Sequence, residues 1–171
     1  GDNGLRYSIL NINLNNGFGD VTLKNILLHA PAFEKLTATK HINNNDIWVL
    51  ASNAYPPGPP PDTAYQYYAY LLTVNGINSP VISSSSISPH KVQDGYLQFN
   101  YSGTKIANAW HTGCSVCVDT TEIMDFDKSS GVLSNPIQLV QDSTDQAYGA
   151  VFSPDESKLY FSLYNMNHDY P

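Results

Sequence analysis

The sequence predicts an all-β fold built from repeated antiparallel strands. Apolar and polar residues alternate over short runs such as 68–73 and 158–163, which is typical of strands with one buried face. Asn, Ser and Gly gather between such runs, as tight turns require. The best helical candidate, Leu23 to Leu36, contains Pro31 and lacks a helical period, so no convincing helix is expected.

The size and composition suit one folded domain with a polar, weakly charged surface. The chain has 171 residues, and 42% of them are apolar, which allows a hydrophobic core. Only 13% are charged, against about 25% in a typical soluble domain. The 12 Tyr residues outnumber the 6 Phe and 2 Trp residues. This mixture favours strands and Asn-rich turns in an extracellular protein.

The charge argues against two classes of partner. Eight basic residues face 15 acidic ones, and the net charge is −7. The basic residues form no cluster that could follow nucleic-acid phosphates, and an anionic membrane surface would repel the chain. No apolar run approaches the roughly 20 residues of a membrane helix. We expect no nucleic-acid partner and no direct membrane insertion. The start at Gly1 is typical of the interior of a longer chain.

One repeated unit joins two strands through a tight polar turn. Residues 152–161 align with residues 99–108, because in both a strand ends in Phe and a second strand begins after Lys. The earliest copy covers residues 36–50. Gly103 takes the last position of its turn, where Glu156 stands in the later copy. The turn at Glu156 is therefore expected to be slightly strained.

A second repeated unit follows the first. Residues 70–82 resemble residues 124–137, and an earlier copy begins at Leu10. Equivalent positions keep a regular spacing, with 59 and 55 residues between Gly17, Gly76 and Gly131, and 59 and 53 residues between Ile47, Ile106 and Leu159. This period, with about four short strands in each copy, fits the blade of a β-propeller better than a helical solenoid. We predict that residues 1–171 are a partial β-propeller domain with about three four-stranded blades of 53–59 residues, a fragment of a larger propeller.

Three insertions follow the second strand of the repeat, at residues 53–66, at residues 111–121 and from residue 164 onward. Equivalent loops of a radial repeat emerge on one face, so we expect the binding surface there. Its candidate residues are Tyr55, Tyr65, Tyr67, His111 and Tyr164. Exposed Tyr beside a rigid polyproline segment would suit a glycan or protein partner. The alternative for any single Tyr is that it fills the core of a blade.

A set of ordered motifs resembles one bacterial family. The motifs are Glu34-Lys-Leu-Thr-Ala-Thr-Lys-His41, Asp46-Ile-Trp-Val-Leu50, Tyr67-Tyr-Ala-Tyr-Leu-Leu-Thr73, Asp125-Phe-Asp127, Ser134-Asn-Pro-Ile137 and Ala147-Tyr-Gly-Ala-Val-Phe-Ser-Pro-Asp155. In this order they resemble the WD40-like propeller of large secreted proteins in gliding and related bacteria, which typically carry a gliding-motility-associated or type IX secretion sorting domain. The resemblance covers about residues 5–163. It implies export, a place on the cell surface or outside the cell, and no established active site or cofactor.

The Cys-x-x-Cys pair formed by Cys114 and Cys117 has several interpretations. In an exported protein a disulfide is the first expectation. A metal site using His111 and both cysteines, with His168 as a fourth ligand, is an alternative, although the motif lacks a second ligand pair. Two free thiols are a further alternative. A thioredoxin-like redox role would need a βαβ context.

Two other patterns predict modification or metal binding. Asp125, Asp127 and Ser129 faintly suggest a calcium loop, but the Gly falls one position late and no bidentate Glu follows. Hairpin turns explain the same residues. Short triplets at Thr63, Thr120 and Ser143 resemble the O-glycosylation signal used by this bacterial group.

These observations favour a non-catalytic scaffold for interaction or adhesion. The expected partners are a protein or glycan at the cell surface, with the remainder of its own propeller or a secretion component covering the free strand edges. No H-E-x-x-H, G-x-S-x-G, Walker or Gly-rich dinucleotide motif occurs in the chain. One alternative is a propeller enzyme acting on extracellular polysaccharide or peptide. Another is a purely structural domain of an export substrate.

Overall fold

The computed structural model describes residues 3–53, 65–86, 94–111, 120–140 and 145–165. These residues confirm the all-β class. They contain no α-helix, and their one helical element is a 3-10 turn at Asn15–Gly17. Accordingly, no helix among the described residues could cross a membrane. The segment 23–36, the best helical candidate, lies in two strands joined at a cis peptide bond before Pro31.

The strands of the described residues run in this order: β1 (Leu5–Asn11), β2 (Asp20–His29), β3 (Ala32–Lys40), β4 (Ile47–Asn53), β5 (Tyr65–Thr73), β6 (Gly76–Ile77), β7 (Val81–Ser85), β8 (Leu97–Phe99), β9 (Lys105–Trp110), β10 (Thr120–Phe126), β11 (Leu133–Val140), β12 (Asp145–Phe152) and β13 (Leu159–Asn165). All the strand pairs among them are antiparallel.

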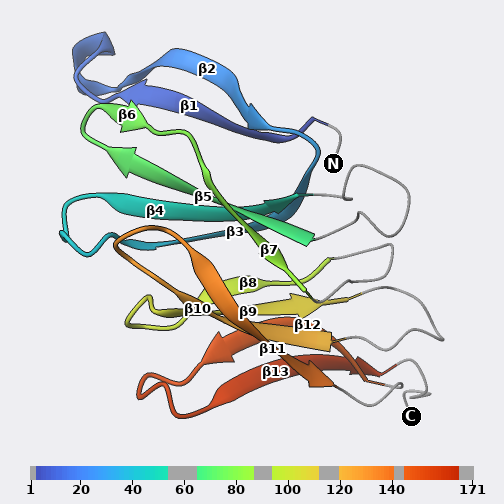
Figure 1. Cartoon of the computed structure of the whole chain (residues 1–171). Helices are drawn as coiled ribbons and strands as arrows, with labels where there is room; N and C mark the ends of the chain where they lie inside the picture. Colours follow the sequence, from blue (N-terminus) through green and yellow to red (C-terminus); the bar gives the residue numbers. More distant parts are fainter. Residues whose placement is uncertain (1–2, 54–64, 87–93, 112–119, 141–144, 166–171) are drawn as a thin grey trace.

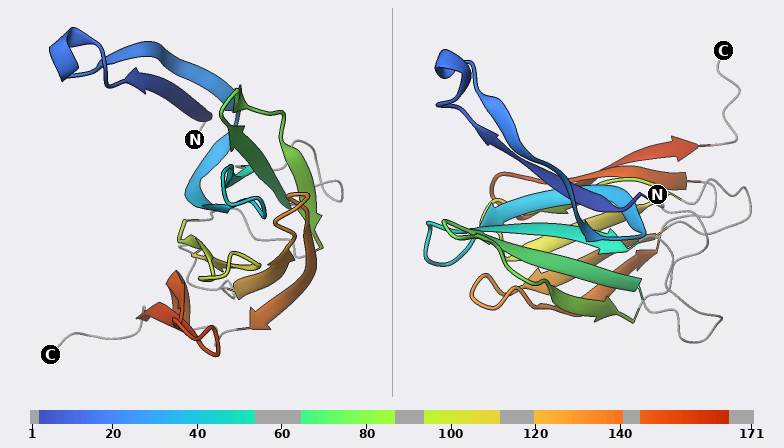
Figure 2. Two further views of the ribbon diagram at one scale, coloured as in Figure 1. Left: turned by 90° about the vertical axis from the view of Figure 1, so that its left-hand side faces the viewer. Right: turned by 90° about the horizontal axis from the view of Figure 1, so that it is seen from above.

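The described strands form four sheets, which follow one another in chain order from the top to the bottom of the view in Figure 1. The N-terminal hairpin consists of β1 and β2. Sheet I has the order β3-β4-β5, with β6 and β7 both paired to β5. Sheet II has the order β8-β9-β10-β11, and the C-terminal hairpin consists of β12 and β13. The N-terminal hairpin projects from the rest of the molecule (Figure 2). No closed ring of sheets is present in the described part of the chain.

The main core lies between sheet I and sheet II. Trp48, Leu50 and Tyr67 of sheet I pack against Ile106 and Met124 of sheet II, together with further buried residues of both sheets. This core follows from the alternation of side chains along each strand, because every second residue of a strand points to the same face of its sheet. The opposite face of β9 carries small alanines, which let the C-terminal hairpin approach closely.

The turns opposite the long connections tie neighbouring sheets together. The Trp48 indole N–H donates to the Lys128 carbonyl oxygen over 2.9 Å, linking sheet I to the turn after β10. The ammonium of Lys128 donates to the Ser102 carbonyl oxygen of the turn after β8, also over 2.9 Å. We call this end of the molecule the turn end.

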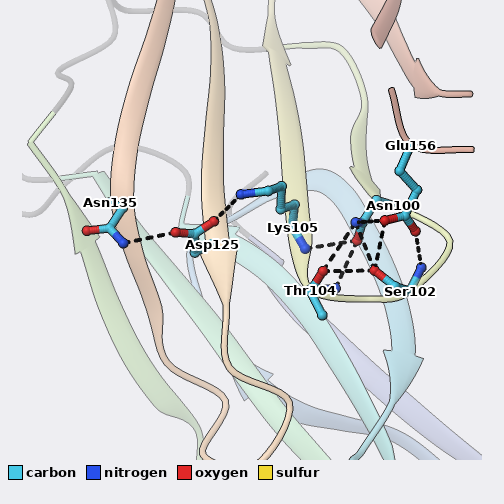
Figure 3. Close-up of polar contacts among 7 residues, drawn as sticks. All are labelled: Asn100, Ser102, Thr104, Lys105, Asp125, Asn135 and Glu156. Atoms are coloured by element: carbon cyan, nitrogen blue, oxygen red, sulfur yellow. Dashed lines mark hydrogen bonds and ion pairs between the residues drawn. The ribbon is translucent and has the colours of Figure 1, made fainter. Parts of the chain in front are cut away.

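Glu156 extends the same linkage to the C-terminal hairpin (Figure 3). Its carboxylate accepts hydrogen bonds from the Asn100 side-chain amide over 2.9 Å, from the Ser102 hydroxyl over 3.0 Å and from the Ser102 backbone N–H. Glu156 has a φ of 59°, and its counterpart Gly103 has a φ of 71°. The expectation of a strained turn at Glu156 is therefore confirmed, and its contacts compensate for the left-handed backbone.

The turn after β10 should depend on pH through Asp127. Its carboxylate accepts hydrogen bonds from the Ser130 hydroxyl and from the backbone N–H and hydroxyl of Ser129, which lower its pKa to about 2. Because the folded pKa lies below the unfolded value, the stability that these bonds contribute is present above about pH 3.9 and is lost as the pH falls toward 2. The variant Asp127→Ala should melt at a lower temperature than wild type at pH 7, and the difference should shrink toward zero near pH 2.

Thermal melts followed by circular dichroism between pH 2 and pH 7 measure this difference. The control is Asp20→Ala, which removes an exposed carboxylate that accepts a hydrogen bond from the N–H of its own neighbour, Val21. A difference between Asp127→Ala and wild type that stays constant down to pH 2 would contradict the assignment.

Candidate functional site

The strand ends that flank the predicted insertions lie at one end of the molecule, which we call the insert end (Figure 1). β4 ends at Asn53 and β5 begins at Tyr65, while β9 ends at Trp110. The ring centroids of Tyr65 and Trp110 are 5.4 Å apart, so these ends of sheets I and II are direct neighbours. Residues 54–64 and 112–119 themselves lie outside the described residues.

Close to this end, a polar cluster is buried between sheets I and II. It consists of Lys35 on β3, Tyr67 on β5, Ser85 on β7, Asn108 on β9 and Glu122 on β10, and we call it the buried polar cluster. Each of these residues is buried, and Tyr67, Asn108 and Glu122 are 0% exposed. Five strands from both sheets therefore contribute to one desolvated site.

The hydrogen bonds of the cluster run from a cation to an anion. The Lys35 ammonium donates to the Asn108 side-chain oxygen over 2.8 Å and to the Ala109 carbonyl oxygen over 2.6 Å. The Asn108 amide donates to the Tyr67 hydroxyl over 2.6 Å, and that hydroxyl donates to the Glu122 carboxylate over 2.7 Å. The Ser85 hydroxyl donates to the other carboxylate oxygen. Charged groups out of water require such partners.

Local sequence explains why these polar groups face inward. Asn108 stands between Ile106 and Trp110 on the face of β9 that packs against sheet I, and Glu122 shares a face of β10 with Met124. Period-two alternation places each polar residue among its apolar neighbours, whatever its own preference for water.

Burial shifts the pKa values of ionisable side chains in the buried polar cluster. Desolvation raises the pKa of Glu122, while hydrogen bonds from Ser85 and Tyr67 and the charge of Lys35 act in the opposite direction. Desolvation, followed by the neighbouring Glu122 carboxylate, raises the pKa of Tyr67 well above 10. Desolvation likewise raises the pKa of Tyr65. Both phenols therefore remain protonated near neutral pH, as donors and not as bases.

The cluster suits a structural role better than a chemical one. The Tyr67 hydroxyl donates one hydrogen bond to Glu122 and accepts one from Asn108, so it makes both of these bonds within the protein. Full burial of Tyr67 and Glu122 keeps a substrate away from them. Networks in a low-dielectric interior specify one arrangement of the groups that they join. We infer that the cluster sets the position of sheet I against sheet II.

His29 of β2 and two tyrosine side chains of β5 join the N-terminal hairpin to sheet I. The His29 ring stacks on the Tyr68 ring with centroids 4.2 Å apart, and its Nδ1 lies 2.9 Å from the Tyr70 hydroxyl oxygen. Burial lowers the pKa of His29, with the Ser52 backbone acting in the opposite direction, and raises the pKa of Tyr70 to about 12. The imidazole is therefore neutral near pH 7, and it links β2 to β5.

The structure gives different outcomes for the five candidate binding residues. Tyr65 and Tyr67 are 1% and 0% exposed, so they belong to the core and cannot form an exposed binding surface. Core packing, the alternative that the sequence left open, explains these two. His111 pairs with Asp94 through backbone hydrogen bonds, and its ring lies 5.9 Å from that of Tyr148. The other two candidates are Tyr164, which lies in β13 without a described side chain, and Tyr55, which lies outside the described residues.

The carboxylates of the suggested calcium loop bind protein donors and do not converge on one point. Asp125 accepts hydrogen bonds from Lys105 and from Asn135 (Figure 3). Asp127 is held by Ser129 and Ser130 within its own turn. No group of three or more potential metal-binding His, Cys, Asp or Glu side chains occurs among the described residues. The hairpin-turn explanation therefore accounts for Asp127 and Ser129, whereas Asp125 lies within β10 and bonds to the strands on either side.

Several other predicted sites fall where the structure describes no side chain. Outside the described residues lie Cys114, Cys117, His168, Thr63 and Ser143. Thr120 begins β10, where its backbone pairs with Trp110 and Val140, and its side chain is not described. The disulfide, metal and glycosylation predictions at these residues stay predictions.

Sequence reasoning missed the buried polar cluster. A signal was available at Asn108 and Glu122, because each is a polar residue at an inward position of an otherwise apolar strand face. Lys35 gave no such signal, since Lys is ordinary on an exposed strand face. Its partner Asn108 is 73 residues away, which only the packing of the sheets reveals.

No protein-family model matches the chain, and no curated protein is significantly similar to it in sequence. The family resemblance of the motifs therefore contributes to a proposal and not to an identification.

Proposed function

We propose that the chain is a segment of a WD40-like β-propeller in a secreted or cell-surface bacterial protein. In this proposal it is a non-catalytic scaffold for interaction or adhesion, linked to type IX secretion or gliding. Its partner is a protein or glycan at the cell surface, bound at the insert end. The ordered family motifs support the compartment, and the arrangement of the sheets supports the scaffold.

The observation that carries the proposal is that the strand ends flanking the two long connections lie together at the insert end. Sheets I and II share one antiparallel order, in which the second and third strands are β4 and β5 in one sheet and β9 and β10 in the other. The strands that flank residues 54–64 and 112–119 have their adjoining ends at the insert end. The short turns at the opposite end are occupied with contacts between sheets. Loops on a rigid scaffold are where binding residues usually occur.

The enzyme alternative has one specific feature in its favour, the shifted pKa values of Glu122 and Tyr67. Both side chains are 0% exposed and hydrogen-bonded to each other, which is the pattern of a structural network. A binding scaffold therefore accounts for the described residues better than catalysis does.

The proposal is tested by replacing the two connections separately. Wild-type protein and variants with residues 54–64 or 112–119 replaced by a two-residue Asn-Gly turn are applied to glycan arrays and to purified outer-surface proteins. We expect wild type to bind and at least one replacement to lose that binding, with the β-sheet circular dichroism signal retained. The matched control is Tyr101→Ser at the turn end, a side chain that is 90% exposed and should be dispensable.

Binding that survives both replacements would place the surface elsewhere. Cleavage of a polysaccharide or peptide by wild-type protein, abolished by the same replacements, would favour the enzyme alternative. Absence of any ligand across the screens would favour the structural export domain.

A further inference from the structure

Two exposed tyrosine rings meet where sheet II contacts the C-terminal hairpin. Tyr96 directly precedes β8, and Tyr148 lies in β12. Their ring centroids are 5.7 Å apart, with an angle of 59° between the ring planes. Tyr96 is 56% exposed and Tyr148 is 41% exposed. The pair therefore presents aromatic surface to the solvent.

Backbone contacts hold the two tyrosines in this arrangement. The Tyr96 N–H donates to the Tyr148 carbonyl oxygen over 2.8 Å, and the Ala109 N–H donates to the Tyr96 carbonyl oxygen over 2.9 Å. Gly95 permits this close approach, because a Cβ there would lie 2.6 Å from the Ala109 carbonyl oxygen and 2.9 Å from that of Tyr148. The rings are thus positioned by hydrogen bonds to β9 and β12, which suits a binding site that must keep its geometry.

Two exposed carboxylates act on the same rings. The Tyr148 hydroxyl donates to Glu34 Oε1 of β3 over 3.5 Å. Asp94 pairs through its backbone with His111, directly after the last residue of β9, which places it at the insert end. The charge of Glu34, followed by desolvation and the charge of Asp94, raises the pKa of Tyr148. Neither carboxylate forms an ion pair with any other described residue.

A hollow of about 330 Å³ lies between β3 and β8 beside these side chains. Glu34, Leu36 and Tyr96 are among its lining residues. Of the described residues that line it, only Lys35 is basic, and the Lys35 ammonium donates to Asn108 in the buried polar cluster. The volume is near the lower limit of ordinary ligand sites. It suits one side chain better than an extended oligosaccharide.

We call this hollow, with the side chains of Glu34, Asp94, Tyr96 and Tyr148, the acidic groove, and we propose that it binds an arginine side chain of a protein partner. A guanidinium is planar, so it can stack on the Tyr96 ring while it donates two parallel hydrogen bonds to the Glu34 carboxylate. A lysine ammonium offers neither the flat face nor the paired donors. The net charge of −7 also attracts a basic segment. The inference rests on the proposed function and names the chemistry of its partner.

The experiment follows the backbone amide signals of isotope-labelled protein by NMR while N-acetyl-L-arginine amide is added to millimolar concentrations. We expect saturable shifts of the Tyr96 and Tyr148 signals, and weaker binding as the salt concentration rises. The matched control ligand is N-acetyl-L-citrulline amide, in which a neutral urea replaces the guanidinium. It should bind about tenfold more weakly, because it loses both the ion pair and the cation–π contact. Glucose is titrated as well.

Two variants test the groove itself. Glu34→Gln keeps the shape of the side chain and removes its charge, whereas Tyr96→Leu keeps an apolar side chain and removes the ring. Each should weaken binding of the arginine derivative about three- to fivefold. The matched controls are Asp20→Asn, at an exposed carboxylate of the N-terminal hairpin, and Tyr101→Leu, at an exposed ring of the turn end. Both should bind like wild type. If Tyr96→Leu loses its β-sheet circular dichroism signal, Tyr148→Leu takes its place.

Each outcome decides the inference. No saturable shift with the arginine derivative overturns it, as does equal binding of the arginine and citrulline derivatives. Binding that neither groove variant weakens lies elsewhere and also overturns it. Shifts of the Tyr96 and Tyr148 signals by glucose alone would assign the groove to a glycan instead.

Failure of this inference can be distinguished from failure of the proposed function. A protein partner whose binding needs the long connections, but neither Glu34 nor Tyr96, contradicts only the inference. Binding of the arginine derivative in the groove, without any protein or glycan partner in the screens, contradicts only the proposed function.

Discussion

Replacing Glu122 with alanine should lower the free energy of unfolding by about 3–5 kcal/mol, the range measured when one partner of a buried charged pair is removed. The substitution removes, inside the core, the acceptor of the Tyr67 and Ser85 hydroxyls. It also removes the negative charge that faces buried Lys35 across the network. Urea unfolding followed by tryptophan fluorescence measures the loss.

The matched control is Glu34→Ala, which removes an exposed carboxylate adjacent to Lys35 in sequence. It should change stability by no more than about 0.5 kcal/mol. Lys35→Met alone should be strongly destabilising, but the double variant Lys35→Met with Glu122→Leu should lose less than the sum of the two single losses. Strict additivity would mean that the two charges do not act through one network.

Glu122 also determines the direction in which the stability of the protein changes with pH. Burial raises the pKa of Glu122, so the folded state holds this proton more tightly than the unfolded state does. The stability of wild type relative to Glu122→Gln should therefore fall as the pH rises from about 4 toward neutrality. A difference that grows in the opposite direction would mean that the hydrogen bonds and Lys35 outweigh desolvation.

Replacing Trp48 with alanine should cost about 3–5 kcal/mol, as truncation of a large buried aromatic side chain does. Trp48 packs edge-on against Phe126, with ring centroids 6.0 Å apart, and donates its indole N–H to the Lys128 carbonyl oxygen. The truncation therefore opens a cavity between sheets I and II and removes a link at the turn end. Chemical unfolding followed by circular dichroism measures the cost.

The close packing of Gly131 against Trp48 provides a second test of this prediction. A Cβ on Gly131 would lie 2.5 Å from the indole Cη2, and Gly131 has a φ of 78°. Gly131→Ala should therefore be destabilising through both a clash and backbone strain. In the Trp48→Ala background the clash disappears, so the same substitution should cost less there. Gly17→Ala, at a φ of 90° with open space around the Cβ, measures the strain alone. Equal costs in both backgrounds would contradict the packing of Gly131 on Trp48.

Local features were predictable because they depend on neighbouring residues. The alternation along residues 158–163 and the Lys that precedes Leu159 identified the strand β13, and the aligned turns at Gly103 and Glu156 both have a positive φ. The absence of a helix in segment 23–36 followed from Pro31 and the missing helical period. At the candidate site, in contrast, Tyr65 and Tyr67 were open to two interpretations, since alternation shows which side chains share a face but not what covers that face.

Alternation, turn residues and recurring motifs were enough to establish the all-β class and the position of the tight turns. They could not show that Lys35, Tyr67, Asn108 and Glu122 form one buried cluster, or that Tyr65 is inaccessible, because both depend on how the sheets pack. The predictable and unpredictable properties differ in how far apart in the sequence the residues that determine them lie. Backbone conformation and alternation arise within a few residues, whereas desolvation arises between strands such as β5 and β10, where the bonded Tyr67 and Glu122 are 55 positions apart.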